Sequence, residues 1–169
     1  MPERYPGYDV LNKRDTVSWN DKTRAVIDSR LAIDANRHLF FNDEEWTTIR
    51  AVCDRIVPQT VARPRPVPLA AMLDEKLHKN SGDGYRHAEL PPMREAWQRG
   101  CAAIDAEAKA AHGRRFHDLG PLEQDAILKA VQEGHTRDHR AWRDLPAKSF
   151  FKKRLLHDIV SLYYSHPTS

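Results

Sequence analysis

The stretch FFNDEEWTTIRAVCDRIVP, residues 40–58, shows most clearly that this chain folds as helices. Asn42 can cap a helix, and Glu45 three residues later completes a capping-box pattern. The apolar side chains that follow recur at helical spacing and form one stripe: Trp46, Ile49, Val52, Cys53, Ile56 and Val57. Pro58 ends the helix, because proline cannot continue one.

The same spacing recurs along the rest of the chain. It predicts further helices over residues 18–33, 69–79, 92–112, 121–133 and 146–166. Gly113 and Gly134 follow two of these segments and are suited to end them. No segment alternates polar and apolar residues with period two, so we expect no substantial sheet. The sequence therefore predicts an all-α fold, a single-domain bundle of about six helices with long loops over residues 18–169.

Two segments outside the helices are candidates for contact with another chain. Residues 1–17 predict an extended N-terminal arm, because prolines and a glycine resist helix formation there. This arm still carries apolar side chains, so it either packs on its own domain or wraps a partner. Residues 58–68 contain four prolines and predict a stiff connector across the domain surface.

Length and charge exclude several classes of protein. With 169 residues the chain is one domain of ordinary size. Its 27 Lys and Arg and 24 Asp and Glu are interleaved, giving a net charge of +3 without the basic face of a nucleic-acid-binding protein. No apolar run approaches the roughly 18 residues that cross a bilayer. No signal-peptide pattern opens the sequence, so we expect none in this chain.

We predict no catalytic, cofactor-binding or metal-binding residues. His135 and His139 are four residues apart, as helical metal ligands can be, but their sequence predicts a solvated loop. His157 and Asp158 invite an acid–base interpretation. Adjacent helical residues point in different directions, however, so we expect His157 to be a half-buried, hydrogen-bonded packing residue.

Aromatic side chains give the clearest indication of a partner. Aromatic residues are adjacent at positions 40–41, 150–151 and 163–164, and one helix face cannot bury both members of such a pair. Protein interfaces are enriched in aromatic residues and arginine, which this chain has in quantity. The predicted partner-interface residues are Tyr5, Tyr8, Leu11, Trp19, Phe40, Pro64, Pro66, Phe150 and Tyr164.

Three segments in order resemble one known family. Residues 40–58 resemble the gluconate 2-dehydrogenase subunit 3 family, also called the gamma or small subunit, with its aromatic, capping residue, acidic pair and apolar helix ending in Asp-Arg-Ile-Val-Pro. GRRFHDLGPLEQDAIL (residues 113–128) and FFKKRLLHDIVSLYYSHP (residues 150–167) are similar to later segments of that family. The stretch RYPGYDVLNKRDTVSWN (residues 4–20) resembles a narrower branch, the small subunits of sugar or glucoside 3-dehydrogenases.

The resemblance implies a non-catalytic accessory subunit of an FAD-dependent sugar or glucoside dehydrogenase complex. Its partner would be a large flavoprotein of the glucose–methanol–choline class, which this chain would stabilise, assemble or escort. FAD would sit in that partner and no cofactor in this chain, and a cytochrome c would take the electrons. The complex would be periplasmic if the partner carries an export signal, and otherwise cytoplasmic. The alternatives are a free-standing binding module or a chaperone that leaves after assembly, and, less favoured, an enzyme using His157 or the His135 and His139 pair.

Overall fold

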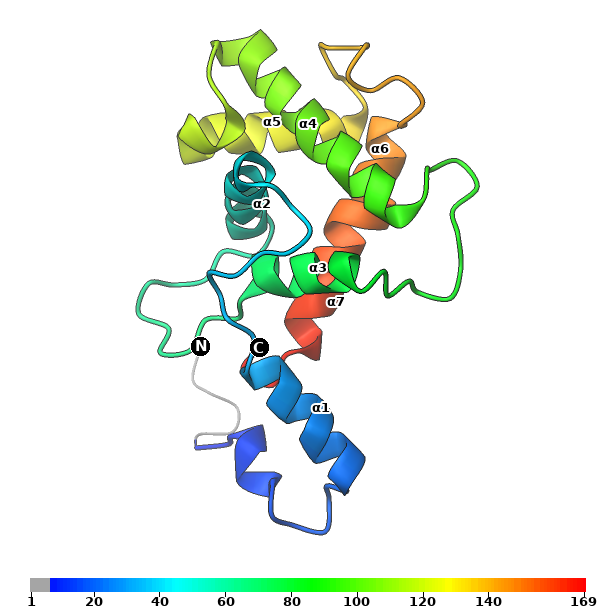
Figure 1. The fold of residues 1–169 in the computed structure, drawn as a ribbon. Coiled ribbons are helices and arrows are strands. Elements are labelled where there is room, and N and C mark those ends of the chain that lie inside the picture. The colour runs from blue at the N-terminus through cyan, green and yellow to red at the C-terminus, as the bar shows by residue number, and fades with distance from the viewer. Residues whose placement is uncertain (1–6) are drawn as a thin grey trace.

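The computed structural model of the chain describes residues 7–169, and every regular element in that range is helical. Five α-helices come first (Figure 1): α1 (Asp21–Leu31), α2 (Asp43–Ile56), α3 (Leu69–His78), α4 (Met93–His112) and α5 (Pro121–Glu133). A long composite helix follows, made of α6 (Ala147–Phe150), a π-helical segment (Phe151–Leu156) and α7 (His157–Ser165). The predicted all-α bundle of six helices is confirmed.

Local sequence explains where the helices begin and end. The Asn42 side chain accepts a hydrogen bond from the Glu45 backbone at 2.9 Å, and the Glu45 carboxylate accepts one from the Asn42 backbone at 3.0 Å. This is the capping box that the sequence predicts. Gly113 and Gly134 end α4 and α5 with φ of 68° and 78°, a left-handed conformation that glycine adopts without strain.

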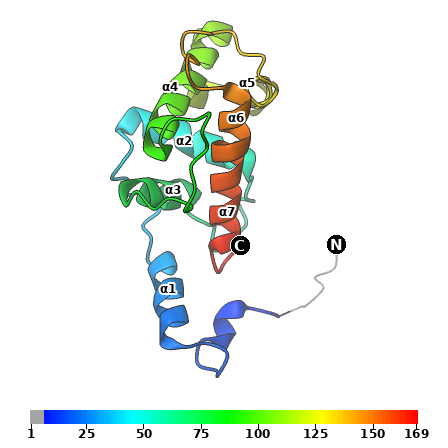
Figure 2. The ribbon, with the colours of Figure 1, turned by 90° about the vertical axis from the view of Figure 1, so that its right-hand side faces the viewer.

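One apolar core lies where α2, α3, α4 and α5 pack around the composite helix (Figure 2). Its largest fully buried side chains include Trp97 of α4 and Phe150 of the composite helix, whose rings meet edge to face at 5.6 Å between centroids. Gly100, one turn after Trp97, lets the two helices approach this closely, because a methyl group at that position would overlap the Phe150 ring. The close packing of α4 and the composite helix therefore depends on the large Phe150 ring facing Gly100, which has no side chain.

The composite helix departs from the single α-helix that the sequence predicts over residues 146–166. Its buried positions fall in two rows with a step of four residues: Ala147, Phe151, Leu155 and Ile159, and Phe150, Arg154 and Asp158. In an α-helix with 3.6 residues per turn, each step of four rotates the side chain about 40° away from the last. The wider π winding reduces this drift and keeps both rows against the core.

The N-terminal module, which we define as residues 7–31, lies beyond the end of α7, away from α2, α4 and α5 (Figures 1 and 2). The sequence predicted an extended arm, but part of the arm forms a 3-10 turn over Val10–Lys13. None of the residues of α1 is buried, and Val26 on its predicted apolar side is 48% exposed. Trp19 is the buried apolar residue of the module, at 8% exposed. The module is thus attached to the bundle and contributes little to its core.

Candidate functional site

An open groove of about 690 Å³ lies between the N-terminal module, the proline-rich connector and the end of the composite helix. We call it the terminal groove. It is lined by Tyr8, Asp9 and Val10 of the arm, Ile27 of α1, Arg63, Pro64 and Arg65 of the connector, and Tyr164, Ser165, His166, Pro167, Thr168 and Ser169 of the C-terminal turn. The fold therefore brings together three segments that are far apart in the sequence.

Three arginines fasten these segments to one another. Arg30 of α1 donates to the carbonyl oxygen of Ser165, and Arg63 donates to that of Thr168 and, at 2.8 Å, to the hydroxyl of Tyr163. Cationic side chains are favoured at such a helix C-terminus, where carbonyl groups lack helical partners. Arg65 forms an ion pair with Asp9 of the arm at 3.3 Å.

His166 lies at the centre of this junction and is only 5% exposed. Its Nδ1 accepts hydrogen bonds from the hydroxyl and the backbone N–H of Thr168, at 2.8 and 3.3 Å, which leaves Nε2 to donate to the carbonyl oxygen of Arg30 at 3.3 Å. Burial, together with the positive charges of Arg30 and Arg63, lowers the pKa of His166 below its usual value. The neutral imidazole thus joins α1 to the C-terminal turn.

Seven of the nine predicted partner-interface residues are exposed, half-buried or outside the described residues. Tyr8 and Tyr164, which are 60% and 75% exposed, line the terminal groove together with the exposed Pro64. Leu11 is half-buried and Pro66 is exposed, both outside the groove lining. Tyr5 lies outside the described residues.

The predictions for Phe150 and Trp19 are wrong, and that for Phe40, which is partly buried, stays a prediction. Phe150 is fully buried against Trp97, and Trp19 is buried in its own chain, so neither offers a surface to a partner. At positions 150–151 both aromatic rings are buried, which the π winding of the composite helix permits. Phe40 packs partly against the core, with the Arg94 guanidinium 4.9 Å from its ring centroid.

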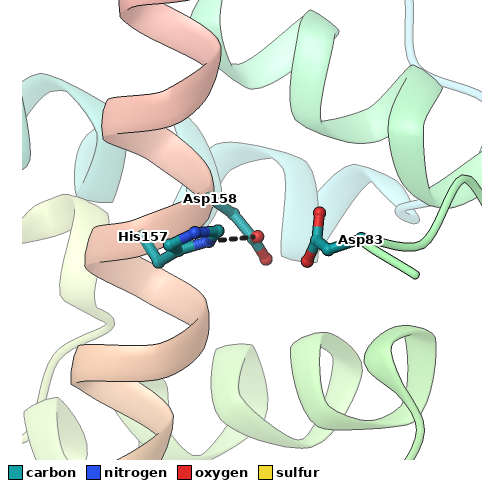
Figure 3. A group of neighbouring side chains, drawn as sticks. All are labelled: Asp83, His157 and Asp158. Carbon is teal, nitrogen blue, oxygen red and sulfur yellow. Dashed lines mark hydrogen bonds and ion pairs between the residues drawn. The ribbon is translucent and has the colours of Figure 1, made fainter. Parts of the chain in front are cut away.

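A second site is a charge cluster beside the composite helix; Figure 3 shows its two carboxylates, Asp83 and Asp158, with the neighbouring His157. Asp158 is fully buried and accepts hydrogen bonds from the Trp97 indole at 2.8 Å and from Lys76 at 3.1 Å. Arg154 forms ion pairs with Asp158 at 3.5 Å and with Asp83 at 3.2 Å, and Lys76 reaches Asp83 at 2.8 Å. Two carboxylates and two cations thus neutralise one another inside the fold.

Proton affinities in the cluster follow from these contacts. Burial alone would raise the pKa of Asp83, but the hydrogen bond and charge of Lys76, with Arg154, outweigh burial and lower it. Burial likewise disfavours the charged form of Lys76, yet hydrogen bonds and charges from Asp83 and Asp158 raise its pKa above the usual value. Both groups are therefore held in their charged forms at neutral pH.

His157 stands at the edge of this cluster with 43% of its side chain exposed. Its Nδ1 lies 3.4 Å from Asp158 Oδ1, so the prediction that the two side chains point apart is wrong (Figure 3). The long imidazole side chain reaches around the helix toward its neighbour's carboxylate. Asp83, His157 and Asp158 come close enough to share a metal ion, and within residues 7–169 they form the one such group of three. Lys76 and Arg154 already occupy the two carboxylates, however, and a cation there would compete with them.

Three further buried carboxylates were not predicted from the sequence. Asp74 accepts three backbone N–H groups of residues 39–41, and Glu107 accepts backbone N–H groups of Arg137 and Asp138 and the indole of Trp142. Asp105 accepts hydrogen bonds from Thr48, Arg115 and the Phe116 backbone. Each fixes a loop to the bundle, because a buried carboxylate is tolerated when several donors surround it. The rigid loop that carries His135 and His139 is one of these, and both histidines are exposed.

Comparisons with known proteins place the chain in a family. Neither a curated protein nor a solved structure matches it. In residues 7–169 no helix has both the length and the apolar character needed to cross a membrane. The family model of gluconate 2-dehydrogenase subunit 3 matches residues 43–169, most of the chain and nearly all of the bundle. The chain therefore belongs to the gluconate 2-dehydrogenase subunit 3 family, whose name describes a subunit of a dehydrogenase complex.

Proposed function

We propose that this chain is a non-catalytic accessory subunit of an FAD-dependent sugar or glucoside dehydrogenase, and that it binds the large flavoprotein subunit through the terminal groove. Its partner would be of the glucose–methanol–choline class, would hold the FAD, and would pass electrons to an acceptor such as a cytochrome c. The complex would be periplasmic if the partner is exported and cytoplasmic if it is not. Family membership supports the existence of a partner.

The terminal groove is the observation that supports its place. Tyr8 and Tyr164 remain 60% and 75% exposed beside arginine side chains, and tyrosine and arginine are enriched among the residues that dominate binding energy at interfaces. The N-terminal module adds further exposed apolar groups, Val17 at 106% and Val26 at 48%. A segment that buries so little of itself is suited to bury more on binding.

The charge cluster supports the non-catalytic part of the proposal. Asp158 has its acceptor capacity taken by Trp97, Lys76 and Arg154, and is therefore occupied in holding the fold. The His157 side chain is 43% exposed, and its Nδ1 faces Asp158 of this neutralised group at 3.4 Å. We expect His157→Ala to leave the turnover of the assembled dehydrogenase unchanged.

Co-expression with the large subunit tests the proposal. The expected result is one gel-filtration peak that contains both chains and absorbs in the flavin band, and a large subunit that is poorly soluble or poor in flavin when this chain is omitted. A stable small chain eluting apart from a fully active flavoprotein would contradict the proposal. Transient association that improves the yield of the large subunit would favour an assembly chaperone instead.

Variants at the groove show whether binding occurs there. Tyr8→Ala and Tyr164→Ala should weaken the complex while leaving the isolated chain folded, because both side chains are largely exposed. Tyr85→Ala is the matched control, since Tyr85 is 55% exposed but lies in the loop between α3 and α4. Equal loss of binding in all three variants would show that the groove is not the specific contact.

A further inference from the structure

Arg63, which lines the terminal groove, and Arg30, which lies beside it and donates to Ser165 of the lining, both lack a carboxylate partner in the part of the chain that the structure describes. Arg30 and Arg63 are half-buried, and among residues 7–169 neither has a carboxylate within 4.0 Å; both donate to carbonyl groups where α7 ends. A helix C-terminus carries only about half a negative charge, so it offsets roughly a quarter of two guanidinium charges. Arg65 adds no net charge, because Asp9 pairs with it.

The bundle treats comparable arginines differently. Arg55, with 25% of its side chain exposed, pairs with Asp125 at 2.7 Å. Arg115, with 26% exposed, pairs with Asp105 at 2.9 Å and Glu44 at 3.3 Å. Partly buried charges are normally compensated in this way. Among the half-buried arginines of residues 7–169, Arg30 and Arg63 are therefore exceptions, and both lie at the terminal groove, Arg63 in its lining and Arg30 beside it.

The rest of the groove lining has a different character. Val10, Ile27 and Pro64 supply apolar surface, and Tyr8 and Tyr164 stand exposed at it. An occupant that matches both properties carries a negative charge next to apolar side chains. A free small anion would satisfy the charge alone and would leave the apolar surface in water.

We infer that the terminal groove binds an extended segment of the large subunit that carries an aspartate or glutamate side chain flanked by apolar residues. Arg63 in the lining, with the charge of Arg30 beside it, provides the electrostatic complement, and Tyr8 and Tyr164 contact the flanking side chains. The inference rests on the proposed function, and it adds the chemistry of the partner's contact segment. Charge complementarity of this kind fixes the register of a complex and accelerates association.

The first test measures the dissociation constant of the complex for a double variant, Arg30→Gln with Arg63→Gln. The expected result is a rise of roughly 30-fold or more, since truncating one side of a desolvated charge pair costs at least about 2 kcal/mol. The salt dependence of binding should also become weaker. The matched control is Arg140→Gln, an exposed arginine in the loop before α6, with an expected change of less than about twofold. Circular dichroism of each free variant confirms that the bundle is folded.

The pKa of His166 in the wild-type chain provides a second measurement, which does not depend on how well a variant folds. Histidine-labelled chain is titrated by NMR, free and in the complex. An arriving carboxylate would offset Arg30 and Arg63 and raise the pKa of His166, whereas an apolar or cationic occupant would lower it further. A double variant that binds as tightly as the wild type, or a His166 pKa that does not rise in the complex, overturns the inference. The wild-type complex would still form in both cases, so the proposed function would stand; absence of any complex would remove both.

Discussion

The first and last helices of this chain differ in how much apolar surface they carry and in how much of it they bury. Both α1 and the composite helix carry apolar side chains at helical spacing, yet α1 has no buried residue while the composite helix buries two full rows. The bundle also neutralises its buried charges internally, as at Asp158, whereas Arg30 at the end of α1 donates to a carbonyl group and has no carboxylate within 4.0 Å among residues 7–169. The contrast teaches that periodicity makes a helix but does not decide what covers it.

The largest expected effect lies in the bundle. Asp158→Ala would leave Lys76 and Arg154 facing only Asp83 and would leave the Trp97 indole without its acceptor. Removing one partner of a buried ion pair typically costs about 3–5 kcal/mol of unfolding free energy. Urea unfolding followed by circular dichroism measures the loss. Asp21→Ala in α1, where the side chain is 99% exposed, should change the free energy of unfolding by less than about 0.5 kcal/mol. Equal losses in the two variants would contradict the difference between the bundle and α1.

The next effect concerns the contact between α4 and the composite helix. Gly100→Ala places a methyl group where the Phe150 ring lies, and overpacking of a core typically costs about 1–3 kcal/mol. The measurement is the unfolding free energy. Gly82→Ala is the control, because a methyl group there meets no atom within 4 Å. A stable Gly100→Ala variant would show that the two helices can move apart without loss.

Low pH should weaken the attachment of the N-terminal module before it weakens the bundle. The pKa of His166 lies below its usual value of 6.5 in the folded chain, so a released module binds the proton more readily and attachment weakens as pH falls below 6.5. Asp83 has a pKa lowered from 3.8, so its contribution to the bundle is present above that pH and is lost as pH falls through the folded pKa. Hydrogen exchange, corrected for intrinsic rates, should show α1 losing protection first, by at most about tenfold per pH unit.

A variant isolates the cause of that acid effect. His166→Asn removes the titrating group, and the protection of α1, corrected for intrinsic exchange rates, should then no longer depend on pH between about 5 and 7, on either side of the usual histidine pKa. If the pH dependence persists, another group controls the junction.

The smallest effect is expected in α1 itself. Val26→Ser replaces a side chain that is 48% exposed, so the free energy of unfolding of the isolated chain should change by no more than about 0.5 kcal/mol. Thermal unfolding followed by circular dichroism measures it. A larger loss would mean that α1 belongs to the core in solution.

Local patterns predicted the elements well, because caps and apolar periodicity act over a few residues. Asn42 with Glu45, and Gly113 at the end of α4, took the roles that their neighbours in the sequence predict. The π segment was missed, since a step of four residues in the buried rows is also compatible with a short α-helix. Gly100 gave no signal, because its role depends on Phe150 fifty residues later.

The candidate site was predictable only in part. Tyr8, Pro64 and Tyr164 were predicted to contact a partner, and the fold exposes all three at one groove, so their contact with a partner stays a prediction. Adjacent aromatic residues were a poor guide at Phe150, where long-range packing buries both rings. The charge balance at Arg30 could not be predicted, because it depends on which segments meet in space.

Hydrogen exchange of this chain, alone and in complex with its large subunit, shows directly whether the partner binds at the terminal groove. Binding there should give new protection in residues 8–31 and around residues 63–65 and 164–168, with little change in α5 or in the loop before α6. Protection confined to α5, that loop or the surroundings of His157, with the terminal groove unchanged, would contradict binding at the groove.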